Sequence, residues 1–179
     1  MKATPISLAL LLAAVAVTIP VLAQDAPAKP CPEAHKLDYL AGKWRLEGDL
    51  VAGVMGPGGK FTGISQLEWM EGGCYLVEHE KYGGALGDDA TLSILGFDRE
   101  RGVYTYYGFN SDGSKEISTG NPTVTGWVWT HPAKLNGKPA TVRYTMTIVS
   151  RTEYSVRSEI SQDGQNWTLF LSGTAHRLQ

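Results

Sequence analysis

The chain has 179 residues, with 16 lysines and arginines and 18 aspartates and glutamates, which gives a formal net charge of −2 at pH 7. The two signs are mixed along the sequence, which excludes the concentrated basic surface that binds nucleic acid or anionic lipid. We therefore expect no nucleic acid partner.

The N-terminus has the composition of a secretory signal peptide. Lys2 precedes an apolar run over 6–22, and the small residue Ala23 closes it. Pro20 interrupts the run and no basic stop follows, so the pattern does not predict a permanent membrane anchor. We predict a signal peptide over 1–23 and a secreted or periplasmic protein, with no stable membrane insertion after the signal is removed.

Residues 24–31 contain two prolines and little that can be buried, which predicts a flexible leader. A short helix is predicted over 32–41, because Pro32 suits the first helical position, apolar residues recur on one face, and Gly42 fits a left-handed stop. The remainder, 32–179, has the size of one domain.

Cys31 and Cys74 are the two cysteines of the chain. An even count in an exported protein favours a disulfide between them. Two separate buried thiols are the alternative.

From Trp44 onward the period of apolar residues changes from helical to two, which indicates strands. We predict strands over 44–51, 60–70, 74–82, 91–98, 103–109, 115–120, 123–130, 141–149, 153–161 and 166–177. Turn sequences rich in glycine, asparagine and aspartate join neighbouring strands, so the predicted topology is a meander. Closing into an up-and-down barrel would hide its edges, and a two-sheet sandwich is the alternative.

The segment 37–48 is similar to the L-x-x-L-x-G-x-W-x-x-x-G opening of lipocalin-like, or calycin-type, barrels. Further segments resemble a bacterial family of domains of unknown function within that group, namely 68–73, 95–98 and 163–174. The resemblance implies an all-β, up-and-down barrel of about ten antiparallel strands with one short N-terminal helix covering one end. It also implies structural roles for Trp44, at the closed end, and for Arg177, as the basic residue over its ring.

If Trp44 marks the inner face and each strand turns its more apolar face inward, the barrel has an aromatic, mostly apolar lining. The expected lining is Tyr75, Val77, His79, Leu92, Ile94, Tyr104, Tyr106, Tyr144, Met146, Ile148, Tyr154, Val156, Ile160, Trp167, Leu169 and Leu171. Such a lining suits a small hydrophobic or amphipathic molecule oriented by tyrosines. The predicted ligand-binding residues are Tyr75, His79, Tyr104, Tyr106, Tyr144, Met146 and Trp167. The alternative is a filled barrel with a structural or interaction role.

His79 is the polar candidate of this lining. The favoured interpretation is an ordinary hydrogen-bonded strand histidine. The alternatives are that it orients a ligand, binds a haem iron, or forms the proton relay of an isomerase or hydrolase with Tyr104 or Tyr106. Nitrobindin-type barrels, a related group, bind haem through a histidine near the last strand. In this sequence His176 lies near the last strand, but the alternation of side chains along the strand places it on the face opposite Trp167. Haem is therefore not favoured, and no cofactor is predicted.

Glu68, Glu78 and Glu80 alternate with apolar residues, which predicts that they lie on a solvated outer face. A carboxylate cluster for acid–base or metal chemistry is the alternative. No metal site is predicted, and the sequence contains no hydrolase, zinc-protease or phosphate-loop motif. The sequence thus predicts an exported, non-enzymatic binder of a small hydrophobic molecule.

Overall fold

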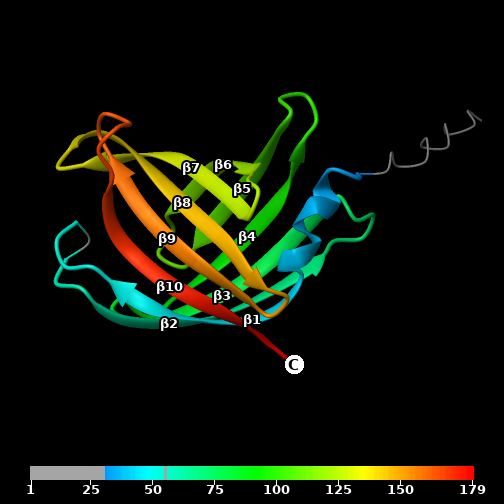
Figure 1. The fold of residues 1–179 in the computed structure, drawn as a ribbon, viewed down its shortest axis with the longest axis horizontal. Helices are drawn as coiled ribbons and strands as arrows, with labels where there is room; N and C mark the ends of the chain where they lie inside the picture. Colours follow the sequence, from blue (N-terminus) through cyan, green and yellow to red (C-terminus); the bar gives the residue numbers. More distant parts are fainter. Residues whose placement is uncertain (1–30, 55) are drawn as a thin grey trace, which may run out of the picture.

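The computed structural model describes residues 31–54 and 56–179, which form a closed barrel of ten antiparallel strands and one short helix (Figure 1). The predicted signal peptide and most of the predicted leader lie outside the described residues. The elements are the 3₁₀ helix η1 (Ala34–Leu40) and the strands β1 (Gly42–Leu50), β2 (Gly59–Trp69), β3 (Tyr75–Gly84), β4 (Asp89–Asp98), β5 (Val103–Asn110), β6 (Lys115–Pro122), β7 (Gly126–Leu135), β8 (Lys138–Ser150), β9 (Glu153–Ser161) and β10 (Thr168–Leu178).

Each strand pairs with its sequence neighbours, and β1 closes the barrel against β10. The predicted up-and-down barrel is therefore confirmed, and the sandwich alternative is wrong. The helix lies across one end of the barrel (Figure 1). No helix within the described ranges is long and apolar enough to cross a membrane.

The hairpin of β7 and β8 is longer than predicted. Pro132 lies within β7, beyond the last residue that pairs with β6, Thr130, so this part of the strand pairs with β8 alone. A proline without an N–H is tolerated in a strand with one free side. The hairpin turns at Asn136 and Gly137, whose φ angles of 53° and 75° are those that a two-residue type I′ turn requires.

The closed end is organised around Trp44, which is fully buried. Its indole Nε1 donates to the carbonyl oxygen of Leu40 at 2.8 Å, which ties the helix to β1. The guanidinium of Arg177, on β10, lies 4.2 Å from the indole ring and donates to the carbonyl oxygens of Ala41 (2.6 Å) and Tyr39 (2.5 Å). The contact expected between these two side chains is therefore present, and it joins the first strand, the last strand and the helix.

A disulfide between Cys31 and Cys74 joins the start of the helical segment to the β2–β3 turn. The predicted disulfide is confirmed and the alternative of separate thiols is wrong. The cysteines are 43 residues apart. Closing a loop of that length stabilises the fold by about 4 kcal/mol in the chain-entropy model.

Aromatic rings lie against glycines on the inner wall. Gly63 pairs with Tyr82 and Gly120 pairs with Trp129 across neighbouring strands. A Cβ atom at Gly120 would come within 2.3 Å of the Trp129 ring, and one at Gly63 within 3.2 Å of the Tyr82 ring. A side chain at Gly120 would clash with the ring, and one at Gly63 would fit only if the Tyr82 ring shifted slightly. The rings are thereby held close to the wall.

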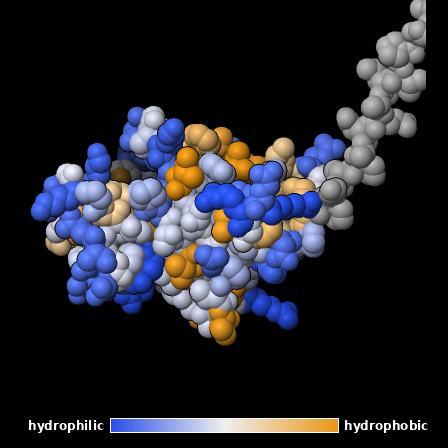
Figure 2. All heavy atoms as spheres, turned by 90° about the horizontal axis from the view of Figure 1, so that it is seen from above, coloured by the Kyte–Doolittle hydropathy of each residue, from blue (hydrophilic) through white to orange (hydrophobic). Residues whose placement is uncertain are grey.

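Apolar side chains form two separate clusters in the barrel. The larger one includes Leu37, Trp44, Trp127 and Met146 at the helix end and extends to Phe61 near the start of β2, at the other end of the barrel. The smaller one is made of Ala140, Val142 and Ile160, with partly buried neighbours. Along β8 and β9, polar inward residues separate the two clusters, namely Tyr144 and Ser158. The outer surface mixes hydrophilic side chains with separate hydrophobic patches (Figure 2).

We predict that Arg177→Ala destabilises the barrel by about 2–4 kcal/mol, because it removes a cation–π contact and leaves two carbonyl oxygens without their donor. The free energy of unfolding in urea measures the loss. Arg177→Lys keeps the charge but not the two-pronged donor, so we expect an intermediate loss. A stability of Arg177→Ala equal to wild type would contradict this role.

Candidate functional site

The register reverses the predicted orientation of β3. Trp44 pairs with Ser65, and Ser65 pairs with Glu80, so all three side chains share the inner face. Glu78 and Glu80 therefore point into the barrel, and Glu80 is only 6% exposed. The prediction of a solvated outer face for these two glutamates is wrong, while Glu68, which pairs with Val77, is exposed on the outer face.

Tyr75 and His79 occupy the other face of β3, and both are exposed. The expectation that they line the interior is wrong. On β4, Leu92 and Ile94 likewise point outward. Ser93, which pairs with Glu78, points inward and is fully buried. The physical reason is that pairing with β2 sets which face of β3 and β4 is inner. The rule that the more apolar face turns inward does not decide the orientation of these two strands, because both faces carry apolar residues.

Trp167 lies outside the barrel as well, in the connection between β9 and β10. The guanidinium of Arg143 stacks 3.9 Å from its ring and donates to a Glu159 carboxylate oxygen at 2.9 Å. Leu169 pairs with Glu159 on the same outer face. The expected inward position of Trp167 and Leu169 is wrong, because a register shift at Leu169–Leu171 changes the parity of β10.

Four predicted site residues do face the interior: Tyr104, Tyr106, Tyr144 and Met146. The Tyr104 ring packs 4.5 Å from Trp127, and its hydroxyl donates to the carbonyl oxygen of Glu33 at 2.9 Å. Tyr104 thus closes the helix end. Tyr106 and Tyr144 lie deeper, among the polar residues.

Glu78 and Glu80 are held by neutral donors. The hydroxyl of Ser65 donates to Glu78 Oε1 at 2.5 Å, and the hydroxyl of Tyr82 donates to Glu80 Oε2. Beside them, the Ser93 hydroxyl donates to the Tyr106 oxygen at 2.8 Å. No ion pair within the described part of the chain involves either glutamate. Two carboxyl groups therefore lie inside the barrel without a basic partner.

Burial raises the pKa of Glu80 well above its ordinary value, the neighbouring charge of Glu78 raises it further, and the hydrogen bond from Tyr82 opposes both effects. Burial also raises the pKa of Glu78, against the hydrogen bonds from Ser65 and Ser93. The pKa of Tyr144 is raised by burial and by the nearby charges of Tyr154, Glu80 and Glu78. These groups thus lie within electrostatic range of one another.

Three inward hydroxyls have no hydrogen-bond partner among the described residues: those of Tyr144, Tyr154 and Ser158. Tyr154 is 5% exposed and Ser158 is 7% exposed, so both side chains are almost completely enclosed. No fully enclosed polar side-chain atom of the described residues lacks a partner. The three hydroxyl oxygens must therefore border open space, although their side chains point into the barrel.

The interior contains one further polar group that the sequence analysis missed. His131 Nδ1 lies 3.1 Å from Glu116 Oε1 and 3.2 Å from Ser118 Oγ. Burial raises the pKa of Glu116, but hydrogen bonds from His131 and Ser118 outweigh it and the pKa is lowered. Because the serine and the carboxylate meet the same ring nitrogen, this is not the serine–histidine–acid relay of hydrolases, which uses both nitrogens.

The alternation of polar residues on β6 and β7 was the signal for this group. The alternation along the strands puts Glu116, Ser118 and His131 on the same inner face as Tyr106 and Trp129. The predicted strand, however, ended at residue 130 and left His131 in a loop.

The relay proposed for an enzyme is not formed. His79 lies on the outer face of the sheet, and Tyr104 and Tyr106 lie on the inner face. His176 is also on the outer face, where its Nδ1 lies 3.7 Å from a Glu153 carboxylate oxygen. The barrel wall separates both histidines from the interior.

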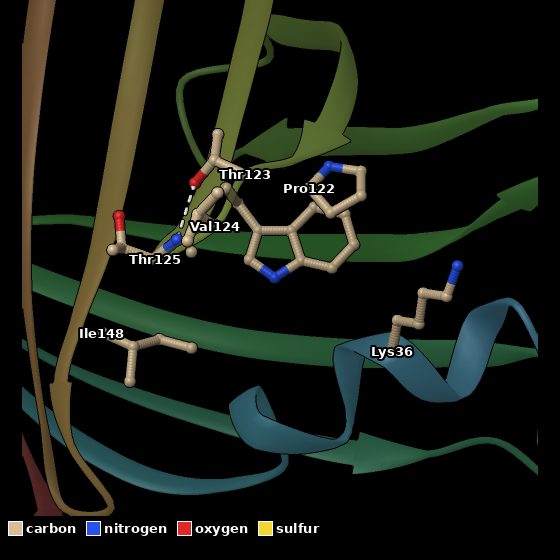
Figure 3. Close-up of a pocket in the computed structure, with 8 residues that line it drawn as sticks. Lys36, Pro122, Thr123, Val124, Thr125 and Ile148 are labelled. Atoms are coloured by element: carbon tan, nitrogen blue, oxygen red, sulfur yellow. Dashed lines mark hydrogen bonds between the residues drawn. The ribbon is translucent and has the colours of Figure 1, made fainter.

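A surface pocket of about 400 Å³ lies at the helix end. Lys36 of η1 faces Pro122 and the β6–β7 loop, Thr123–Thr125, across it, and Ile148 lies below (Figure 3). Trp127 also lines this pocket, and its ring stacks 5.7 Å from Trp129. The stacked indoles therefore separate this pocket from the interior polar residues.

A protein-family model described as "Protein of unknown function (DUF1579)" matches residues 29–177. No curated protein matches the chain. Among solved structures, the chain is similar to the crystal structure of Rv2717c from M. tuberculosis, with 17% sequence identity and a TM-score of 0.64, over 84% of this chain and 100% of that chain. A likeness at this identity concerns the barrel fold alone.

We predict that Glu80→Gln becomes increasingly more stable than wild type as pH rises from about 5 to 8. The pKa of Glu80 is raised in the folded state, so its contribution to stability is fully present below the ordinary glutamate pKa. That contribution is lost as pH rises through the raised value. Thermal unfolding midpoints measured across this range test the prediction. Glu68→Gln, on the outer face, is the matched control, and an equal pH trend in both variants would contradict it.

Proposed function

The chain belongs to the DUF1579 family of proteins of unknown function, and from the chemistry of its interior we propose that it binds a small hydrophobic or amphipathic molecule inside the barrel, without catalysis.

One observation carries this proposal. Inward side chains in the middle of the barrel keep accessible surface, as Glu78, Tyr106 and Tyr144 do, although apolar clusters lie beside them. In a filled barrel these positions would be packed against one another. Accessible polar groups between two apolar regions match the usual composition of a small-molecule site.

The proposed ligand contacts divide into two kinds. Trp129 and Met146 offer apolar surface at the helix side, which would hold the ligand by burial. The hydroxyls of Tyr144, Tyr154 and Ser158, with the pair Glu78 and Glu80, would orient its polar group. Tyr106 and Tyr144 thus keep the ligand-binding role proposed from the sequence, whereas Tyr104 packs at the helix end.

We also propose that the protein works outside the cytoplasm, either secreted or in the periplasm. The signal-like composition of residues 1–23 supports this, and the disulfide between Cys31 and Cys74 is compatible with an oxidising compartment. The resemblance of the 37–48 segment to lipocalin-like barrels agrees with a binding role.

The first test measures displacement of a neutral apolar dye, N-phenyl-1-naphthylamine, from the purified protein. We predict that Ser158→Leu weakens dye binding on the order of tenfold, because the added side chain occupies interior space. Ser155→Leu is the matched control, since Ser155 lies on the outer face of the same strand. It should bind like wild type.

Stability of the same variants separates a hollow barrel from a filled one. In a hollow barrel, Ser158→Leu is tolerated, with a change in unfolding free energy below about 1 kcal/mol. A loss of about 3 kcal/mol or more, together with no dye binding by wild type, would mean that the interior is filled. Native mass spectrometry of protein purified from its host should then show a retained small molecule only in the hollow case.

A further inference from the structure

We propose that the interior selects a ligand whose polar group is a protonated amine carried on an apolar body. This inference names the ligand class of the site described above, so it rests on the proposed binding function.

The first step is the charge of the site. Glu78 and Glu80 follow one another on the inner face of β3, and every hydrogen bond that they accept comes from a neutral hydroxyl, such as those of Ser65 and Tyr82. Neutral donors orient a carboxylate but do not compensate its charge. The pair therefore favours a cation beside it.

The second step is that the described residues do not supply this cation. Arg177 is inward but lies at the helix end, engaged with Trp44 and two carbonyl oxygens. His131 is engaged with Glu116, and Lys138 is exposed at the far end of β8. A positive group that meets Glu78 and Glu80 would thus have to arrive with a ligand.

An independent observation points to the same place. Tyr154 and Ser158 are almost completely buried, yet their hydroxyls have no partner among the described residues and border open space. Tyr144 and Tyr154 face the same interior as Glu78 and Glu80. Burial raises the pKa of both phenols, and the charges of the two glutamates raise it further. Carboxylates accept hydrogen bonds, hydroxyl oxygens accept as well as donate them, and a protonated amine carries several donors.

The same charges argue against other polar groups. A fatty acid or another anion would bring negative charge beside two buried carboxyl groups, which the low interior polarity makes unfavourable. A metal ion would need more ligands, and no group of three or more histidine, cysteine, aspartate or glutamate side chains comes together among the described residues. The aromatic wall, in which the ring centres of Tyr106 and Trp129 lie 6.4 Å apart, suits a cation carried on an apolar chain.

The test uses three molecules with one apolar body: octylamine, octanol and octanoate. Each is titrated at pH 7 against the full-length mature protein loaded with the neutral dye. We expect octylamine to bind at least about tenfold more tightly than octanol, as one charge-assisted contact allows, and octanoate to bind most weakly. Octanoate binding as tightly as octylamine, or octanol matching octylamine, would overturn the proposal.

A double variant, Glu78→Gln with Glu80→Gln, tests the residues. It should lose on the order of tenfold in octylamine affinity and keep its octanol affinity. Glu68→Gln on the outer face is the control and should keep both. Unchanged octylamine affinity in the double variant would assign the preference to other groups and overturn the proposal.

The two proposals fail in different ways. If the wild-type protein binds neither the dye nor any of the three molecules, the binding function itself is wrong. If it binds the dye and octanol but does not prefer octylamine, the binding function stands and the amine selectivity is wrong. Because the wild-type series alone decides this, the result does not depend on whether the double variant folds.

Discussion

The alternation of side chains in a closed, hydrogen-bonded ladder is the constraint on which the rest of this structure depends. Trp44 is fixed inside by its contacts with Leu40 and Arg177, and the ladder runs from β1 through β2 to β3 without a register shift. Every second residue on these strands must then face inward. Glu78 and Glu80 are inside because the indole at position 44 is inside.

This constraint sets an energetic conflict in the middle of the barrel. Burying two neighbouring carboxyl groups is unfavourable, and hydroxyl donors such as those of Ser65 and Tyr82 offset only part of the cost. A fold that served stability alone would place apolar side chains there. Positions where a sequence breaks the usual rules of stable packing are often functional. The buried pair of glutamates is such a position, which agrees with a binding site built around it.

The glycines of the wall complement the polar middle. Because Gly63 and Gly120 have no side chain, the rings of Tyr82 and Trp129 lie close to the sheet. Aromatic surface is thereby present without filling the centre, where Tyr144 and Ser158 keep open hydroxyls. The same barrel thus combines apolar walls with a small set of polar groups, which together define how a ligand would be oriented.

The sequence by itself predicted much of the architecture: local period and turn residues indicated the strands and the helix, and the cysteine count favoured the disulfide. The resemblance to lipocalin-like barrels implied the contact of Arg177 with Trp44. The sequence did not determine which face of each strand is inner. β3 and β4 carry apolar residues on both faces, so pairing with β2 decides their orientation, and for β10 a register shift reverses the alternation. Side-chain direction in a barrel is fixed by pairing across strands, which is a property of the tertiary structure. Only the tertiary structure could therefore move the candidate site from His79 to Glu78 and Glu80.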